Sequence, residues 1–240
     1  MRRGFRVLLV LGLFATGLSA CGDEAAPLAA RVIVFLDDDV ANQTGPVEQR
    51  IRTMPGVTDV VVTTKEQAYD QFQRDWSDAP ATAKAVRPGD LPASLQVTVT
   101  DLWHAEAVEL AIATFDGVQD ASLSVADGDL TAQERVGFIV RMEPNPTSAQ
   151  RDGVETFIRG LPGVDAIVYE TPERTRERLR ERCRDHAELA AAFEQVEVAD
   201  IPASFRFRLE LGEKVPQLTE LMKLDGVTPF SFVPAELVKD

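Results

Sequence analysis

One ten-residue segment occurs twice in this chain in closely similar form. The sequence DLPASLQVTV occupies residues 90–99, and DIPASFRFRL occupies residues 200–209, which lie 110 residues further on. A second pair, MPGVTDVVV at 54–62 and LPGVDAIVY at 161–169, is separated by 107 residues. A period of this length is much longer than that of solenoid repeats and equals the size of a small domain. The chain is therefore predicted to contain two tandem copies of one domain.

Both copies show the same order of expected elements. An apolar strand precedes a helix whose apolar residues recur at i, i+4 and i+7, and a Pro-Gly pair ends this helix before a second strand. A longer helical insertion follows, over 65–86 in the first copy and 172–196 in the second. The repeated ten-residue segment then leads into a third strand, and a further helix and a last strand complete the copy.

The order β-α-β, helical insertion, β-α-β defines the expected fold class. We predict an α+β protein with two tandem split-βαβ (ferredoxin-like) domains, each an antiparallel sheet with two helices on one face and an inserted small helical lobe. The third helix of the first copy carries Val108, Ile112 and Phe115 as its apolar stripe. Because each copy has its own strands, helices and closing turn, each is expected to fold alone.

The first twenty residues have the pattern of an export signal. Arg2, Arg3 and Arg6 precede the apolar segment 7–18, which is too short to span a bilayer as an ordinary helix. The segment ends in Leu-Ser-Ala-Cys, a bacterial lipobox, which predicts cleavage before Cys21 and lipidation of that residue. The alternative is a plain secretory signal followed by a chance cysteine. With lipidation, the mature protein is expected on the outer face of the cell membrane, held by its lipid anchor only.

These features divide the chain into five parts. The predicted parts are a lipoprotein signal peptide at 1–20, a lipidated tether at 21–30, a first domain at 31–126, a linker at 127–134 and a second domain at 135–240. The whole chain has a formal net charge of −14, and removal of the basic signal peptide makes the mature protein more acidic. An acidic surface repels phosphate backbones, which excludes nucleic acid as an expected partner.

The residues that carry enzyme or metal chemistry do not form a recognisable pattern. The two histidines, His104 and His186, lack zinc-ligand spacing and are expected at the surface. The run Asp37 to Asp39 follows a strand and fits a solvated strand end better than a cation site. A Ser-His-Asp order and a glycine-rich phosphate loop are both missing from the sequence. The chain is therefore predicted to be no enzyme, with no cofactor and no metal.

The two inserted lobes carry the candidate binding residues. In the first lobe Tyr69, Phe72 and Trp76 follow one another at i, i+3 and i+7, a stripe that fits either a core or an interface. The helix at 171–186 of the second lobe is rich in Arg and Glu and has a narrow apolar seam through Leu179. It is either a solvated helix stabilised by ion pairs or a basic face that binds an acidic partner. The predicted partner-binding residues are Tyr69, Phe72, Trp76, Leu179, Arg176 and Arg180.

Three segments of the first copy resemble the extracellular domain of the bacterial cell-division protein FtsX. They are VFLDDDV at 34–40, MPGVTDVVVTTKEQAYDQF at 54–72 and RPGDLPASLQVTV at 87–99. The second copy keeps LPGV and DIPASF but lacks the pattern that KEQAYDQF has in the first. Proteins of the FtsX family have four membrane helices and act with an ATPase, whereas this chain has a lipobox and no such helices.

The resemblance implies a function for the chain. In the family, the extracellular domain binds and activates peptidoglycan hydrolases or their adaptors through its helical lobe. The resemblance therefore implies a non-catalytic lipoprotein that binds a peptidoglycan hydrolase, its adaptor or the division complex, and regulates the cell wall or cell division. The alternative is a sensor lipoprotein that holds a small molecule or a wall fragment between the two copies. A deep apolar pocket between the copies would favour the sensor.

Overall fold

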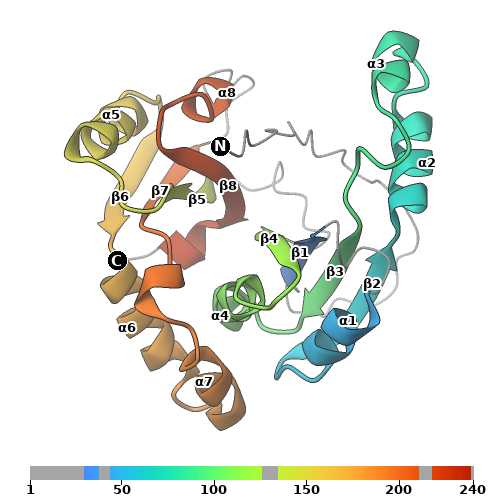
Figure 1. Ribbon diagram of the computed structural model, residues 1–240. Helices are drawn as coiled ribbons and strands as arrows, with labels where there is room; N and C mark the ends of the chain where they lie inside the picture. The colour runs from blue at the N-terminus through green and yellow to red at the C-terminus, as the bar shows by residue number, and fades with distance from the viewer. Residues whose placement is uncertain (1–29, 38–43, 126–134, 211–217, 239–240) are drawn as a thin grey trace, which may run out of the picture.

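The structure is a computed structural model of the chain, and it describes residues 30–37, 44–125, 135–210 and 218–238. The expected signal peptide, Cys21 and the expected linker lie outside the described residues, as do Asp38 and Asp39. The two sheets, their helices and both inserted lobes lie within them (Figure 1).

The first domain has the predicted split-βαβ topology. Its four strands form one sheet in the order β2-β3-β1-β4, and every neighbouring pair is antiparallel. The inserted lobe consists of two helices, α2 and α3, between β2 and β3. The elements are β1 Ala30–Leu36, α1 Gly45–Arg52, β2 Val57–Thr63, α2 Lys65–Asp75, α3 Pro80–Ala85, β3 Ser94–Val99, α4 Leu102–Ala113 and β4 Val118–Val125.

The second domain repeats this topology strand for strand. Its sheet has the order β6-β7-β5-β8 with antiparallel neighbours, and its lobe contains α6 and α7. The predicted fold class, two tandem α+β domains, is confirmed. The elements are β5 Arg135–Met142, α5 Ser148–Arg159, β6 Val164–Glu170, α6 Pro172–Cys183, α7 Ala187–Phe193, η2 Val198–Asp200, β7 Ser204–Glu210, α8 Leu218–Leu221, β8 Val227–Pro234 and η3 Ala235–Val238.

Local sequence signals set where several helices begin and end. Thr64 caps α2: its side chain accepts a hydrogen bond from the Gln67 backbone N–H at 3.2 Å, and the Gln67 side chain accepts one from the Thr64 N–H at 2.9 Å. Thr147 and Gln150 form the same capping box at the start of α5. Gly163 has a φ of +74° in the turn from α5 to β6, a left-handed conformation that glycine adopts without steric cost.

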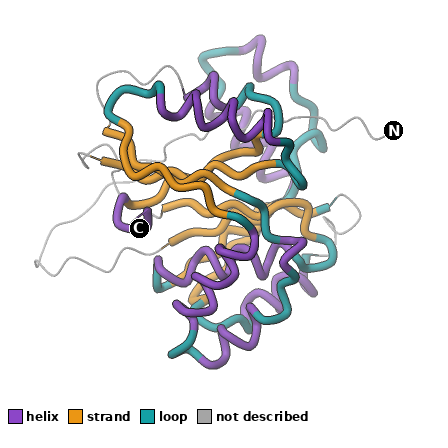
Figure 2. The backbone as a smooth tube through the Cα atoms, turned by 90° about the vertical axis from the view of Figure 1, so that its left-hand side faces the viewer, coloured by secondary structure: helices purple, strands orange, loops and turns teal. Residues whose placement is uncertain are grey.

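The two domains have different cores. In β1 the alternate residues Ala30, Val32, Val34 and Leu36 are buried together with apolar residues of α1 and α4. In the second domain, Val136, Phe138, Val140 and Met142 of β5 belong to a separate cluster with α5 and α8. The rings of Phe138 and Phe207 stack there at 4.9 Å. Figure 2 shows the strands of both sheets in the middle of the molecule with helices above and below them.

Helix α4 joins the two domains. Every residue from His104 to Ile112 is buried, so the helix has no face in water. One side packs on β1 and β4 of its own sheet, and another side contacts α6 and α7 of the second domain (Figure 1). The apolar cluster around α4 includes second-domain residues, among them Ile139, Leu179, Cys183, Leu189, Phe193 and Val233. The stripe Val108, Ile112 and Phe115 is therefore only part of the contact surface that α4 uses.

Because the two domains share a core around α4, we expect each copy to be less stable alone than in the full chain. Fragments 30–126 and 135–238 should each melt at a lower temperature than the full chain, because separation exposes the second-domain side of α4 and its apolar partners to water. Thermal unfolding followed by circular dichroism measures this. Mixing the two fragments should raise the melting temperature again, and a fragment that melts at the temperature of the full chain would contradict the interpretation.

Candidate partner-binding lobes

The two helical lobes are equivalent in position within their domains. Thr64 and Thr171 are the N-caps of α2 and α6, and they are 107 residues apart. With the same offset, Phe72 of α2 corresponds to Leu179 of α6, and Trp76 corresponds to Cys183. Residues of α2 and α6 that are 107 positions apart therefore occupy equivalent places on the two helices.

The seam of the second lobe is buried within the chain. Thr175, Leu179 and Cys183 lie on one face of α6 and have exposed fractions of 3%, 0% and 0%. This face packs against α4 of the first domain. The prediction that Leu179 contacts a separate partner is therefore wrong, because the apolar seam of α6 already covers apolar surface of its own chain.

A network of four charged side chains accompanies this contact. Arg178 of α6 donates to both carboxylate oxygens of Glu106 in α4, at 3.0 and 3.1 Å, and to both oxygens of Glu170 in β6, at 2.7 and 2.8 Å. Arg206 of β7 also donates to Glu106, at 2.8 Å, and to the carbonyl oxygen of Leu237, at 3.1 Å. Two guanidinium groups from the second domain thus bind a carboxylate from the first.

The network controls the ionisation of its members. Burial opposes the charged form of both carboxyls, but Arg206 and Arg178 outweigh it at Glu106, and Arg178 outweighs it at Glu170, so the pKa of each carboxyl lies below its ordinary value. Burial also opposes the charge on Arg178, and the two carboxylates outweigh it and raise its pKa. All three groups are therefore charged in the folded protein at neutral pH.

A second ion pair crosses the same contact. Both guanidinium ends of Arg141 in β5 donate to the two oxygens of Glu109 in α4, each at 2.5 Å. Glu109 also accepts a hydrogen bond from the Leu123 N–H of edge strand β4 at 2.8 Å. Burial raises the pKa of Glu109, with Arg141 opposing that shift, and Glu109 in turn raises the pKa of Arg141 against the effect of burial. Glu106 and Glu109 are not among the residues predicted from the sequence, although two glutamates inside the apolar run AEAVELAIA are a usable signal.

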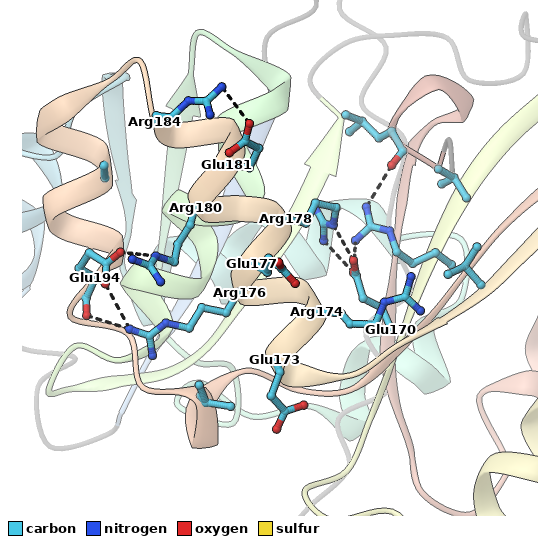
Figure 3. Close-up of a pocket in the computed structure, with 16 residues that line it drawn as sticks. Glu170, Glu173, Arg174, Arg176, Glu177, Arg178, Arg180, Glu181, Arg184 and Glu194 are labelled. Carbon is cyan, nitrogen blue, oxygen red and sulfur yellow. Dashed lines mark hydrogen bonds and ion pairs between the residues drawn. The ribbon is translucent and has the colours of Figure 1, made fainter.

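Arg176 and Arg180 lie on the side of α6 that faces away from Arg178 (Figure 3). Both pair with the side chain of Glu194, which follows α7, at 3.4 and 2.5 Å (Figure 3). They line a groove of about 1140 Å³, together with Glu173, Glu177 and other residues of both charges. The side chain of Arg180 remains 58% exposed. Arg180 is thus exposed and Arg176 half-buried, and both contact an acidic residue of the same chain.

The seam of the first lobe has no comparable cover. Helix α2 contains no buried residue, and Tyr69, Phe72 and Trp76 are each partly exposed. The structure brings Phe72 and Trp76 together, with ring centroids 6.0 Å apart. Helices α2 and α3 stand away from the sheet at the far side of the molecule from α6 and α7 (Figure 1). The aromatic stripe is thus neither a closed core nor a contact between the two domains.

The described part of the chain contains neither a metal-ion cluster nor a membrane-spanning helix. In residues 30–37, 44–125, 135–210 and 218–238, the His, Cys, Asp and Glu side chains form no group of three that could hold a metal ion. Over the same ranges, none of the helices combines the length and the apolar character needed to cross a membrane.

Comparison with known proteins identifies a family. The sequence profile of the FtsX extracellular domain matches residues 29–126 and matches again over 135–229. The two successive matches agree with the tandem copies, and the resemblance seen in the sequence is confirmed. This family is a non-catalytic, extracytoplasmic domain associated with cell division. A search of curated proteins finds no match to this chain.

The buried network predicts both a mutational cost and a pH dependence. Glu106→Gln should lower the free energy of unfolding at pH 7 by about 3–5 kcal/mol, because Arg206 loses its closest buried counter-charge and Arg178 keeps only Glu170. Since the pKa values of Glu106 and Glu170 lie below the ordinary 4.5 in the folded state, their contribution to stability is present above about pH 4.5 and is lost as the pH falls below it. Urea unfolding between pH 7 and pH 3 measures both effects.

The matched control for this variant is Glu48→Gln. Glu48 pairs with Arg52 at 2.8 Å on the exposed side of α1, with the i,i+4 spacing of an ordinary helix pair. Its removal should cost at most about 0.5 kcal/mol and leave the acid dependence unchanged. Equal effects of the two substitutions would show that the network contributes no more than a surface pair.

Proposed function

Because the chain belongs to the FtsX extracellular domain family, we propose that it is a lipid-anchored, extracytoplasmic binding protein whose first lobe binds a protein partner in cell-wall or cell-division regulation. One observation carries the proposal. The seams of the two lobes are equivalent, the second is filled by α4 of the same chain, and the first is not filled. The uncovered seam of the first lobe consists mainly of the large rings of Phe72 and Trp76.

The chemistry of the first lobe supports a protein as its partner. Partly exposed aromatic side chains supply a large apolar area at a low cost in conformational entropy, and they are enriched among the residues that dominate protein interfaces. The lobe projects from the sheet, so a partner could contact it without disturbing the sheet of the first domain (Figure 1). We assign Tyr69, Phe72 and Trp76 to this surface, with Trp76 at the end of α2 as its main contact.

The partner that the family suggests is a peptidoglycan hydrolase, its adaptor or another component of the division complex. The proposed anchor at Cys21 would keep the lobe close to the membrane surface on the side where the cell wall is assembled. The chain would then act as a doubled extracellular domain of the FtsX type that is held by lipid. It would have no part in an ATP-driven step of its own.

The alternative, a sensor that holds a small molecule between the two copies, has less support. That reading requires an apolar pocket in the space between the domains, and α4 packs there against α6 and α7. The groove of about 1140 Å³ lies along the second lobe and is lined mainly by charged side chains. Small-molecule sites are instead lined mainly by hydrophobic and aromatic residues.

The proposed anchor gives a direct prediction. The wild-type protein should incorporate a fatty-acid probe during metabolic labelling, and Cys21→Ala should abolish the incorporation and release the protein from the membrane fraction. Cys183→Ala is the matched control, because Cys183 is the second cysteine of the chain and lies buried in α6. Wild-type protein that takes up no label would end the proposal of a lipid anchor.

The binding surface gives a second prediction. Trp76→Ala should weaken capture of the partner from native membranes by at least thirtyfold, or about 2 kcal/mol, and leave the melting temperature unchanged. Trp103→Ala is the control, because Trp103 is the other tryptophan and its ring is 42% exposed outside the lobe. A photo-crosslinker at position 72 identifies the captured protein. A collapsed melting curve, or full capture at a normal melting temperature, would contradict the assignment of Trp76.

A further inference from the structure

The two histidines of the chain meet across the contact between the domains. His104 lies in the first turn of α4, and His186 is the N-cap of α7 in the second lobe. Their ring centroids are 4.3 Å apart in an edge-to-face arrangement. The surface position expected for both is correct for His186, which is exposed, and wrong for His104, which is only 9% exposed.

Both ring nitrogens of His104 face oxygen atoms that can only accept a hydrogen bond. Its Nδ1 lies 3.0 Å from Oδ2 of Asp101, the N-cap of α4, and its Nε2 lies 3.2 Å from the backbone oxygen of Arg182 in α6. A neutral imidazole has one N–H and can donate to one of these oxygens, whereas the imidazolium donates to both. The Arg182 oxygen belongs to the last turn of α6, where carbonyl groups lack intrahelical partners and a positive charge is favoured.

We propose that His104 is a proton-dependent clamp that holds the second lobe against the first domain. With two protons, its ring joins Asp101 of the first domain to the end of α6 in the second. Loss of one proton removes one of the two hydrogen bonds and leaves a nitrogen lone pair directed at an oxygen. The contact between α4 and α6 is therefore tighter with the charged ring.

The charged groups around His104 come from three elements. Asp101 of α4 favours the charged ring, and Glu106, two residues further along α4, is already bound by Arg178 and Arg206. From the second lobe, two cationic or titratable groups oppose the charge. They are His186, in ring contact, and Arg182, whose guanidinium lies 4.8 Å over the neighbouring Trp103 ring. The Cys183 thiol lies close by, and burial raises its pKa, which keeps it uncharged.

The sign of the pH effect follows from the hydrogen bonds. Only the imidazolium donates to both oxygens, so the clamp should tighten as the pH falls and loosen as it rises. This dependence is opposite to that of Glu106 and Glu170, whose contribution to stability is lost only below about pH 4.5. The contact between the domains is therefore expected to be tightest in mildly acidic solution.

Cys183 provides a local measurement of the contact. Its side chain is fully buried in the seam of α6, so a thiol reagent reaches it only when the second lobe separates from α4. In the full chain with Cys21→Ser, Cys183 is the only thiol. The labelling rate with a maleimide is compared between this protein and its His104→Gln variant at pH 6 and at pH 8.5. Because both proteins carry the same thiol, the effect of pH on the thiolate cancels in the ratio of the two rates.

The clamp predicts a ratio that depends on pH. At pH 6, His104→Gln should label about tenfold faster, because glutamine cannot replace the second charged hydrogen bond. At pH 8.5 the two rates should agree within about twofold, because the neutral ring and the glutamine amide each have one donor nitrogen and one acceptor atom. His186→Asn is the matched control at the same contact: it removes a group that opposes the charge on His104, so it should still label more slowly at pH 6 than His104→Gln does. A ratio that is equal at the two pH values, or equal rates at pH 6, would overturn the proposal.

A second variant covers the case in which His104→Gln does not fold. Asp101→Asn keeps the cap of α4, since an asparagine oxygen can still accept the Trp103 N–H that Asp101 now binds at 2.8 Å. It removes the negative charge that favours the imidazolium. The pH at which labelling accelerates should then move to lower values than in the wild type, and an unchanged profile would contradict the clamp.

Discussion

The burial of two glutamates in α4 is the interaction on which the arrangement of this protein depends. Glu106 and Glu109 are taken out of water on a helix that has no exposed face. An unpaired carboxylate in such a place costs several kcal/mol, and the guanidinium groups that offset the cost, Arg141, Arg178 and Arg206, all belong to the second domain. The first domain can therefore bury α4 only with the second domain in place.

The duplication explains why one lobe is free and the other is not. Two copies of the domain give two equivalent lobes, but the residues that form the seam, and the residue beside it, differ between the two lobes. In α6 the seam residues are smaller than the aromatic rings of α2, α4 packs against them, and Arg178 beside them binds Glu106. In α2 the corresponding positions carry Phe72 and Trp76, and Gln71 stands in the place of Arg178. The pattern KEQAYDQF is missing from the second copy, whose lobe packs on α4 of its own chain.

Local patterns predicted the fold well and the contact between the domains poorly. The repeat, the capping residues Thr64 and Thr147 and the alternating strands each act over a few residues, so the sequence alone indicates them. The partners Arg178 and Glu106 are 72 residues apart, and a pattern within one helix does not show that they meet. For the same reason the seam through Leu179 was interpreted as a surface for another protein, and the aromatic stripe of α2 stayed open between core and interface.

The shared core also affects how the first lobe can act. A single domain of this kind would present its lobe on a small body with one sheet, and motion of that body would add to the entropy lost on binding. Here α4 is fixed between the first sheet and the second lobe by apolar contacts and two sets of ion pairs. The second copy thus fixes α4 of the first domain from a second side, while the apolar seam of its own lobe is covered. One lobe with partly exposed aromatic residues in each chain is the arrangement that follows from these contacts.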